Sequence, residues 1–465
     1  MDKSLIRRWL FGLSVIAILP LSVLAQTEFV YLNNGSSGNS VSGFSVSKDG
    51  TLIELPGSPF QTGGWGFSGG DILVVRGFLY VVNTNSGNIS ASSIDPLTGN
   101  LTEVPGSPFS VPTESFGTPR TLAATPDGKF LIVNSAVPGT ISILNIASDG
   151  SLAPVTAQPF HVGEIIRQIK VSPDGKFLAA AVYSRSSIVM LNIAADGTLT
   201  PVPGSPFPTT HAFAFASAID FSCDGSTLFV GNATISPPLI DVFSVGSSGA
   251  LTPVTGSPFR PGAGADSGIV QMGPNNQYFF VTNFESATVT VFRVRPDRSL
   301  EPVSGSPFQA GGLAPSGISI NQSGTVLVVV INGSPLLDAG VGAFKIAPDG
   351  TLIPVTGSPF KLNIPAYNTR LSSITSYPVH DCALRVDGIS VKGKKLFVAG
   401  QNFDNGSVIL LNGEPQNTKN DAENWTTTLI GKKSGKNVRI GDKIQALTSN
   451  GRLSPVFTVA SLAFP

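Results

Sequence analysis

The sequence predicts an all-β chain: a seven-bladed β-propeller closed by N- and C-terminal strands in one blade, plus a small C-terminal β-sandwich. Two observations lead to this prediction. Charged residues make up only 12% of the 465 residues, while the 51 Gly and 36 Pro suit short strands joined by tight turns. A short motif also recurs about every 50 residues, a period typical of propeller blades rather than helical repeats.

The recurring motif is Gly-Ser-Pro-Phe, with one Ala-Gln-Pro-Phe variant. Its Phe falls at positions 60, 109, 160, 207, 259, 308 and 360, so the spacings are 49, 51, 47, 52, 49 and 52 residues. Pro cannot donate a hydrogen bond, which places it at the end of an outer strand. We expect the Phe to be largely buried between blades and to serve packing rather than ligand contact.

Each unit has the same internal order of short strands and turns. One unit is expected to contain strands at Arg167–Val171, Phe177–Val182, Ser187–Ile193 and Thr198–Val202, ahead of Gly204–Phe207. The connections carry Pro-Asp-Gly or Asp-Gly, which favour tight hairpin turns because Gly takes positive φ at little cost. Four antiparallel strands of this kind make one blade.

The number of blades follows from counting strands. Inner strands are expected near Asp71, Arg120, Arg167, Ser217, Gly268, Ser316 and Arg370. Second strands are expected near Phe29, Phe78, Phe130, Phe177, Leu228, Tyr278 and Val326. The first unit lacks an inner strand and the last inner strand, Leu371–Ser376, lacks a following unit. We therefore predict that this strand completes the first blade and removes an open sheet edge.

The N-terminus carries the features of an export signal. Lys3, Arg7 and Arg8 precede an apolar run from Trp9 to Ala25, which ends in a plausible cleavage site. An uncleaved membrane anchor is the alternative, but the position of the small residues favours cleavage. We expect residues 1–25 to be a signal peptide and the mature protein to be periplasmic, at the cell surface or secreted, with no membrane span.

The predicted propeller covers residues 26–378. After residue 378 the repeat stops and the composition changes. Residues 379–465 show short alternating strands and Gly/Asn turns, which predict a β-sandwich. The segment Gly431–Lys436 reads as a solvated hairpin tip rather than a basic binding site. Cys223 and Cys382 are the only cysteines; export permits a disulfide, but we expect two unpaired thiols.

Composition and motifs argue against several classes of chemistry. The span 26–378 has 15 Lys/Arg against 21 Asp/Glu, and 379–465 has 11 against 7, so neither part forms the broad basic face that nucleic acid requires. The three His show no metal-ligand spacing, and no phosphate-binding loop or nucleophile motif occurs. We expect no metal, no cofactor and no nucleic-acid partner.

Several of these residues carry a family resemblance. The run Pro173-Asp-Gly-Lys-Phe177, the strand Phe280-Val-Thr-Asn283 and the Asp-Gly-Thr-Leu endings resemble the seven-bladed lactonase-like propellers. That family includes 6-phosphogluconolactonase and borders the YVTN repeat proteins. The tail resembles immunoglobulin-like domains of the IPT/TIG type, through Gly-Gln-Asn-Phe and Val-Ile-Leu-Leu-Asn-Gly.

The resemblance implies a lactonase activity, yet two motif positions differ. Enzymes of the family show Gly-Pro-Arg-His at an inner-strand start, whereas Arg120 is followed here by Thr121 and Arg167 by Gln168. The family's Asn-Glu-Leu becomes Asn-Phe-Glu, which displaces Glu285 by one residue. A shift of one residue turns a strand side chain to the opposite face. The sequence thus leaves open whether the protein is an enzyme.

The strongest candidate site lies where the inner strands begin. Alignment of the Pro-Asp-Gly turns superposes Arg120 on Arg167, and Asp71 and Arg370 begin their own inner strands. Guanidiniums gathered at one mouth of the channel attract carboxylate, phosphate or acidic sugar. The alternative is that each Arg pairs locally and only fills the channel. His211 and Glu285 are lesser candidates for the same face.

Two functions follow from these observations. The first is an exported binding or scaffold protein that recognises an anionic small molecule or sugar, with the tail available to a protein or cell-surface partner. The second is an extracytoplasmic hydrolase or lyase acting on a sugar lactone or a related anionic substrate. An acid or base within hydrogen-bond reach of the arginines would favour the enzyme.

Overall fold

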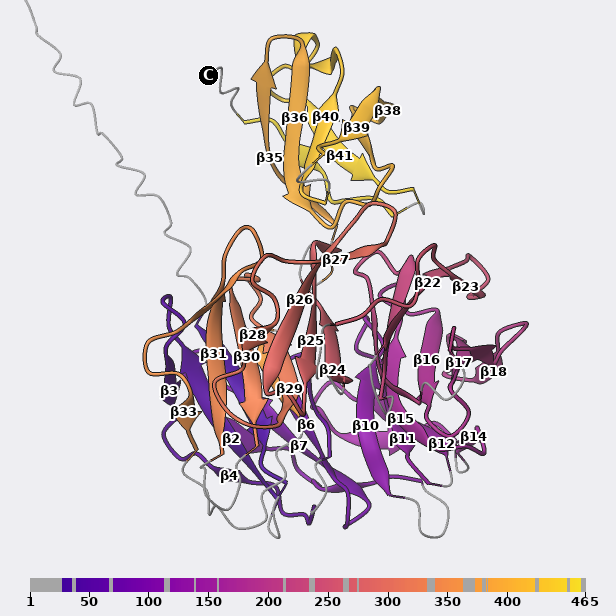
Figure 1. Ribbon diagram of the computed structural model, residues 1–465, viewed down its shortest axis with the longest axis vertical. Coiled ribbons are helices and arrows are strands. Elements are labelled where there is room, and N and C mark those ends of the chain that lie inside the picture. The colour runs from indigo at the N-terminus through magenta and orange to yellow at the C-terminus, as the bar shows by residue number, and fades with distance from the viewer. Residues whose placement is uncertain are drawn as a thin grey trace, which may run out of the picture.

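The computed structural model describes residues 27–35, 39–66, 70–112, 118–137, 139–156, 159–211, 215–233, 239–261, 267–273, 276–332, 339–362, 373–378, 382, 384–422, 426–449 and 452–460. Seven antiparallel sheets surround a central axis, and a separate β-unit stands at one end of the ring (Figure 1). The predicted all-β fold and the seven blades are therefore confirmed. The expected signal peptide lies outside the described residues, and no helix within them is long and apolar enough to span a bilayer.

Each blade runs outward from the axis through four antiparallel strands. The inner strands are β34 (Ile374–Tyr377), β5 (Ile72–Val75), β10 (Pro119–Ala124), β15 (Ile166–Val171), β20 (Ala216–Phe221), β24 (Ser267–Met272) and β29 (Pro315–Ile320). The second strands are β1 (Glu28–Asn33), β6 (Phe78–Asn83), β11 (Phe130–Ser135), β16 (Phe177–Val182), β21 (Thr227–Asn232), β25 (Tyr278–Asn283) and β30 (Val326–Ile331).

The outer half of each blade is equally regular. The third strands are β2 (Ser40–Val46), β7 (Asn88–Ile94), β12 (Thr140–Ile146), β17 (Ser187–Ile193), β22 (Leu239–Val245), β26 (Thr288–Val294) and β31 (Gly340–Ile346). The fourth strands are β3 (Leu52–Glu54), β8 (Leu101–Glu103), β13 (Leu152–Pro154), β18 (Leu199–Pro201), β23 (Leu251–Pro253), β27 (Leu300–Pro302) and β32 (Leu352–Pro354).

The ring is closed by strands from the two ends of the propeller. β34 pairs antiparallel with β1, with Phe29 opposite Tyr377 and Leu32 opposite Ile374. This is the predicted closure of the first blade by the last inner strand. Because β1 is paired on both sides, neither terminal strand leaves an exposed edge that could recruit another chain.

The Gly-Ser-Pro-Phe motif adds a short fifth strand that the repeat pattern did not reveal. These strands are β4 (Phe60–Gln61), β9 (Phe109–Ser110), β14 (Phe160–His161), β19 (Phe207–Pro208), β28 (Phe308–Gln309) and β33 (Phe360–Lys361); blade five has a single bridge between Ile240 and Phe259. In blade four, β18 and β19 pair with successive parts of β17, at Leu191–Ile193 and at Ser187–Ile188. The motif therefore spans a gap along one strand edge.

The Ser of the motif fills that gap. The Ser205 Oγ accepts a hydrogen bond from the Met190 backbone N–H at 2.9 Å, and the Met190 carbonyl accepts one from Val202 N–H. The same serine-to-backbone bond occurs in all six Gly-Ser-Pro-Phe copies, at Ser58, Ser107, Ser205, Ser257, Ser306 and Ser358. The Ser of each motif thus accepts a hydrogen bond from a backbone N–H of the third strand. That N–H lies between the parts of the third strand that pair with the fourth and fifth strands.

The seven motif Phe residues lie between blades, but they are half-buried rather than largely buried as predicted. Each packs against a cluster built from its own blade and the next; Phe207, for example, contacts the cluster that contains Met190 of blade four and Phe243 of blade five. The rings fall short of full burial because β19 and its equivalents lie at the outer edge of the sheet, where one ring face meets solvent.

Asp-Gly turns also serve the packing between blades. Gly150, after β12 in blade three, has φ +86°, and a Cβ there would lie 2.3 Å from the Phe78 ring of blade two. Only Gly meets both demands, because it adopts positive φ readily and leaves room for the ring. The recurring turn Gly is thus part of the contact between blades.

Truncating one motif Phe should weaken the contact between its two blades. We expect Phe207→Ala to lower the free energy of unfolding by about 2 kcal/mol, roughly half the cost of removing a fully buried Phe. Leu97→Ala, at a side chain that is 82% exposed, is the matched control and should change it by less than about 0.5 kcal/mol. Urea denaturation measures both; equal effects would contradict the packing role.

The C-terminal unit is built from two four-stranded sheets. One contains β35 (Arg385–Lys392), β36 (Lys395–Gln401), β40 (Thr428–Gly431) and β39 (Thr418–Asn420); the other contains β38 (Glu414–Pro415), β37 (Val408–Leu411), β41 (Lys443–Leu447) and β42 (Phe457–Thr458). A short 3-10 helix, η2 (Ser434–Lys436), follows β40. Leu396, Val398, Phe403, Ile409 and Ile444 from both sheets form one buried core, as a sandwich requires.

The prediction of two unpaired thiols is wrong, because Cys223 and Cys382 form a disulfide. Cys223 lies in the turn after the inner strand of blade five, and Cys382 follows β34 shortly before β35. Arg452 of the C-terminal unit donates to the Cys223 carbonyl at 2.8 Å and to the Cys382 carbonyl at 2.7 Å. The sequence hid the pair because the two cysteines are 159 residues apart and meet only once the ring is closed.

Removing this connection should loosen the C-terminal unit. We expect Cys382→Ser combined with Arg452→Ala to lower the free energy of unfolding by roughly 2–5 kcal/mol, the range for a disulfide closing a long loop. It should also enlarge the radius of gyration measured by small-angle X-ray scattering. Arg452→Ala alone, which keeps the disulfide, should leave the radius unchanged; an unchanged radius in the double variant would show that other contacts suffice.

Candidate functional site at the channel mouth

The inner strands of all seven blades enclose a cavity of about 1450 Å³ along the central axis. At one end the lining includes Arg120 and Arg167, which lie near the start of β10 and β15. At the other end it includes Cys223, Cys382 and Arg452, where the C-terminal unit meets the ring. The mouth with the two arginines is therefore the one that faces away from the C-terminal unit.

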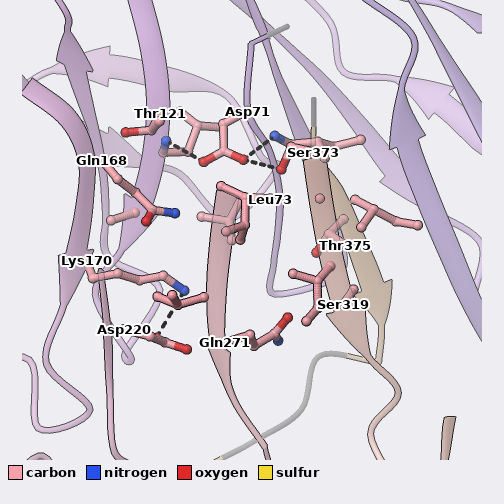
Figure 2. A pocket seen from close by; sticks show the side chains of 18 of the residues that line it. Asp71, Leu73, Thr121, Gln168, Lys170, Asp220, Gln271, Ser319, Ser373 and Thr375 are labelled. Atoms are coloured by element: carbon pink, nitrogen blue, oxygen red, sulfur yellow. Dashed lines mark hydrogen bonds and ion pairs between the residues drawn. The ribbon is translucent and has the colours of Figure 1, made fainter. Parts of the chain in front are cut away.

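Strand registers place the side chains of the cavity in levels. Ile72, Leu122 and Ile169 pair with equivalent residues of the second strands, so Asp71, Thr121 and Gln168 share one level, and Ser373 lies beside Asp71. Two residues further along the strands lie Leu73, Lys170, Asp220, Gln271, Ser319 and Thr375. Figure 2 shows the first group above the second.

Polar side chains of the inner strands bind the backbone of the next blade. The Asp71 carboxylate accepts a hydrogen bond from Leu122 N–H at 3.0 Å, and Gln168 Oε1 accepts one from Ile219 N–H at 2.7 Å. Deeper in the cavity, Asp220 accepts one from Met272 N–H at 2.8 Å. Because neighbouring blades share no backbone ladder, these bonds connect them around the axis.

Asp71 lies one level deeper than expected, next to the arginines rather than among them. Its carboxylate also accepts hydrogen bonds from Ile72 N–H and from the Ser373 hydroxyl. Burial raises the pKa of Asp71, and the bonds from Leu122 and Ser373 oppose that rise. Both carboxylate oxygens are thus already engaged within the protein.

Arg120 and Arg167 occupy the same structural position in adjacent blades. The register shifts between Pro119 and Thr121 in β10 and between Ile166 and Gln168 in β15, so each arginine is the extra residue of a β-bulge. Bulges change the direction of a side chain at the rim of a sheet. Ser217 and Ser316 fill the equivalent positions in blades five and seven, so among the described bulges the positive charge comes from blades three and four.

The two guanidiniums form no ion pair with any residue that the structure describes. Among those residues, the buried Nε of Arg167 also has no hydrogen-bond acceptor. The Arg167 guanidinium lies 4.4 Å from the centroid of the Tyr183 ring, and Tyr183 stacks on Phe215. Burial, and then the charge of Arg167, lower the pKa of Arg120, while Asp71 opposes the shift.

The other predicted site residues do not join this group. His211 is exposed in the segment after β19, and Glu285 is exposed between β25 and β26; neither lines the cavity, although Phe284 does. Arg370 lies outside the described residues. The structure thus brings together Asp71, Arg120 and Arg167.

Some residues of the mouth were missed by the sequence prediction. Tyr183, which supports Arg167, lies just after the second strand of the same blade, and no motif marks it. Gln168 and Ser373 follow from a better alignment, because both share the level of Asp71 once the bulge is counted. An alignment that follows the strand register would therefore have identified Gln168 and Ser373, but not Tyr183.

Comparison with known proteins identifies the family. Residues 113–424 match the family model described as lactonase, 7-bladed β-propeller, which is more than half of the chain. The chain therefore belongs to the lactonase family of seven-bladed β-propellers.

Solved structures share this fold at low sequence identity. A periplasmic gluconolactonase of Pseudomonas aeruginosa is 18% identical with a TM-score of 0.59, over 75% of this chain and 99% of that one. A Bacteroides fragilis protein proposed to be a 6-phosphogluconolactonase is 19% identical with a TM-score of 0.60, over 76% and 99%. A Lactobacillus plantarum protein is 17% identical with a TM-score of 0.60, again over 76% and 99%. The search of curated proteins found no match.

Removing one guanidinium should stabilise the protein when no anion is present. We expect Arg120→Met to raise the free energy of unfolding by about 1 kcal/mol at low salt, because it removes a buried charge that repels Arg167. Phosphate should reduce or reverse this gain, since an anion bound between the arginines stabilises the wild type. Arg260→Met, at an exposed arginine, is the control; a loss of stability in Arg120→Met would show that Arg120 is satisfied in the folded protein.

Proposed function

We propose that this lactonase-like propeller is exported and binds a small anionic molecule, a sugar acid or sugar lactone, at the channel mouth. The single observation that carries the proposal is the pair of guanidiniums of Arg120 and Arg167, which line one end of a large cavity and form no ion pair with any described residue. Guanidinium forks bind planar carboxylates and phosphates with two hydrogen bonds. A bound anion would also relieve the repulsion between the arginines.

Binding is the better supported of the two functions. Asp71 is the described acid whose charge acts on Arg120, but both of its oxygens accept hydrogen bonds from the protein. His211 and Glu285, the other acid–base candidates, do not line the cavity. Among the described residues, the mouth therefore offers guanidinium N–H donors that can bind an anion. None of the acid–base candidates named above is both at the mouth and free of hydrogen bonds to the protein.

Thermal shift tests this binding. The melting temperature of the wild type should rise with increasing 6-phosphogluconate or gluconate, because a ligand of the native state stabilises it by mass action. Arg120→Ala with Arg167→Ala should abolish the rise while leaving the fold intact. His211→Ala with Glu285→Ala is the matched control and should retain the full rise; an unchanged rise in the arginine variant would place the site elsewhere.

Lactone hydrolysis is the second candidate, and one observation favours it. The pKa of Asp71 is raised by burial beside two arginines, a combination that suits a proton-transferring acid near groups that polarise a carbonyl. A pH-indicator assay with glucono-1,5-lactone tests it. Hydrolysis no faster than in buffer would exclude this activity on that substrate and leave binding as the function.

A further inference from the structure

A second charged surface lies at the opposite end of the molecule from the channel mouth. The turn between β35 and β36 carries Lys392, Lys394 and Lys395, and the segment around η2 carries Lys432, Lys433 and Lys436. We call these six residues the lysine tip. In Figure 1 the β35–β36 turn is at the end of the C-terminal unit that points away from the propeller.

Backbone contacts hold the two lysine segments together. Leu396 pairs with Gly431 in the ladder between β36 and β40, and Gly435 N–H donates to the Lys394 carbonyl at 3.1 Å. The sequence alone predicts a solvated hairpin tip at Gly431–Lys436, a segment with three lysines. The structure doubles that number by placing the distant β35–β36 turn beside it.

The lysine side chains are free to bind a partner. All six are exposed, and in the part of the chain that the structure describes none of them forms an ion pair. The tip contains six of the eight lysines of residues 379–465, whereas its two segments, 392–395 and 432–436, contain no acidic residue. Such segregation of charge creates a positive potential that attracts polyanions.

We propose that the lysine tip binds an acidic polysaccharide whose uronate carboxylates repeat along the chain. The two tip segments contain no aromatic residue, so they lack the stacking platforms with which proteins hold single-stranded nucleic acid. Val391, Leu396 and Val438 beside the lysines are buried, and the exposed Ile440, four residues after Lys436, is one apolar side chain rather than the apolar face that inserts into a bilayer. Lysine ammonium groups act as separate point charges, which suits carboxylates spaced along a polymer.

Binding of fluorescent alginate fragments tests the proposal on the full chain. The variant Lys394→Glu with Lys432→Glu should weaken binding at least about tenfold at low salt, because it replaces two attractive charges with two that repel the polyanion. Affinity should fall steeply with added salt for the wild type and less steeply for the variant. Lys48→Glu with Lys345→Glu, two exposed lysines of the propeller, makes the same change in net charge and should bind as the wild type does.

Several outcomes would overturn this assignment. Equal weakening by both variants would show a response to net charge rather than to the tip. Absence of alginate binding by the wild type would also overturn it, as would tighter binding to phosphatidylglycerol vesicles or to oligothymidine than to alginate. Circular dichroism of each variant confirms folding. The thermal shift with sugar acids at the channel mouth is independent, because it depends on Arg120 and Arg167.

Discussion

The pairing of β34 with β1 is the contact on which the rest of the structure depends. It joins residues 374–377 to the first strand of the chain and converts a row of blades into a ring. Two of the seven clusters between blades, those on either side of blade one, exist only because β1 and β2 occupy their place in the ring. Without closure, blade one would lose its inner strand and the channel would lose one wall.

Closure also determines which residues meet at the axis. Blades share no backbone ladder, so single bonds align neighbouring inner strands: Asp71 to Leu122, Gln168 to Ile219, and the backbone bond from Asp71 N–H to the Arg120 carbonyl. The same alignment brings Arg120 and Arg167 together although 47 residues separate them in the sequence. Two like charges held there cost stability, a cost that the proposed binding of an anion would offset.

The sequence predicted the features that repeat and missed those that occur once. The motif period and the hairpin turns located the blades, and the second strand of blade four has its expected bounds, Phe177–Val182. The disulfide between Cys223 and Cys382 was missed because neither cysteine belongs to the repeat, and only ring closure makes them neighbours. No single-sequence pattern encodes that distance.

The errors within the repeat have a different cause. Asp71 was placed one level too high because β10 and β15 contain a bulge, and counting residues from a turn does not reveal an inserted one. The motif Phe is less buried than predicted. The reason is that the fifth strand that carries it lies at the blade edge and is only two residues long. His211 and Glu285 were grouped with the arginines by blade position alone, but their side chains stand outside the cavity. Local pattern therefore identified the blade, while bulges and loops decided which side chains reach the axis.

The disulfide gives the two ends of the molecule a fixed relation. It fastens the C-terminal unit at the end of the channel where Arg452 completes the lining, whereas Arg120 and Arg167 line the other end. The lysine tip points away from the propeller on the side of the covered end (Figure 1). A polyanion held by the tip would therefore lie at the end of the molecule opposite Arg120 and Arg167. The proposed attachment at one end and the proposed capture of a small anion at the other are compatible because the two positive surfaces do not overlap.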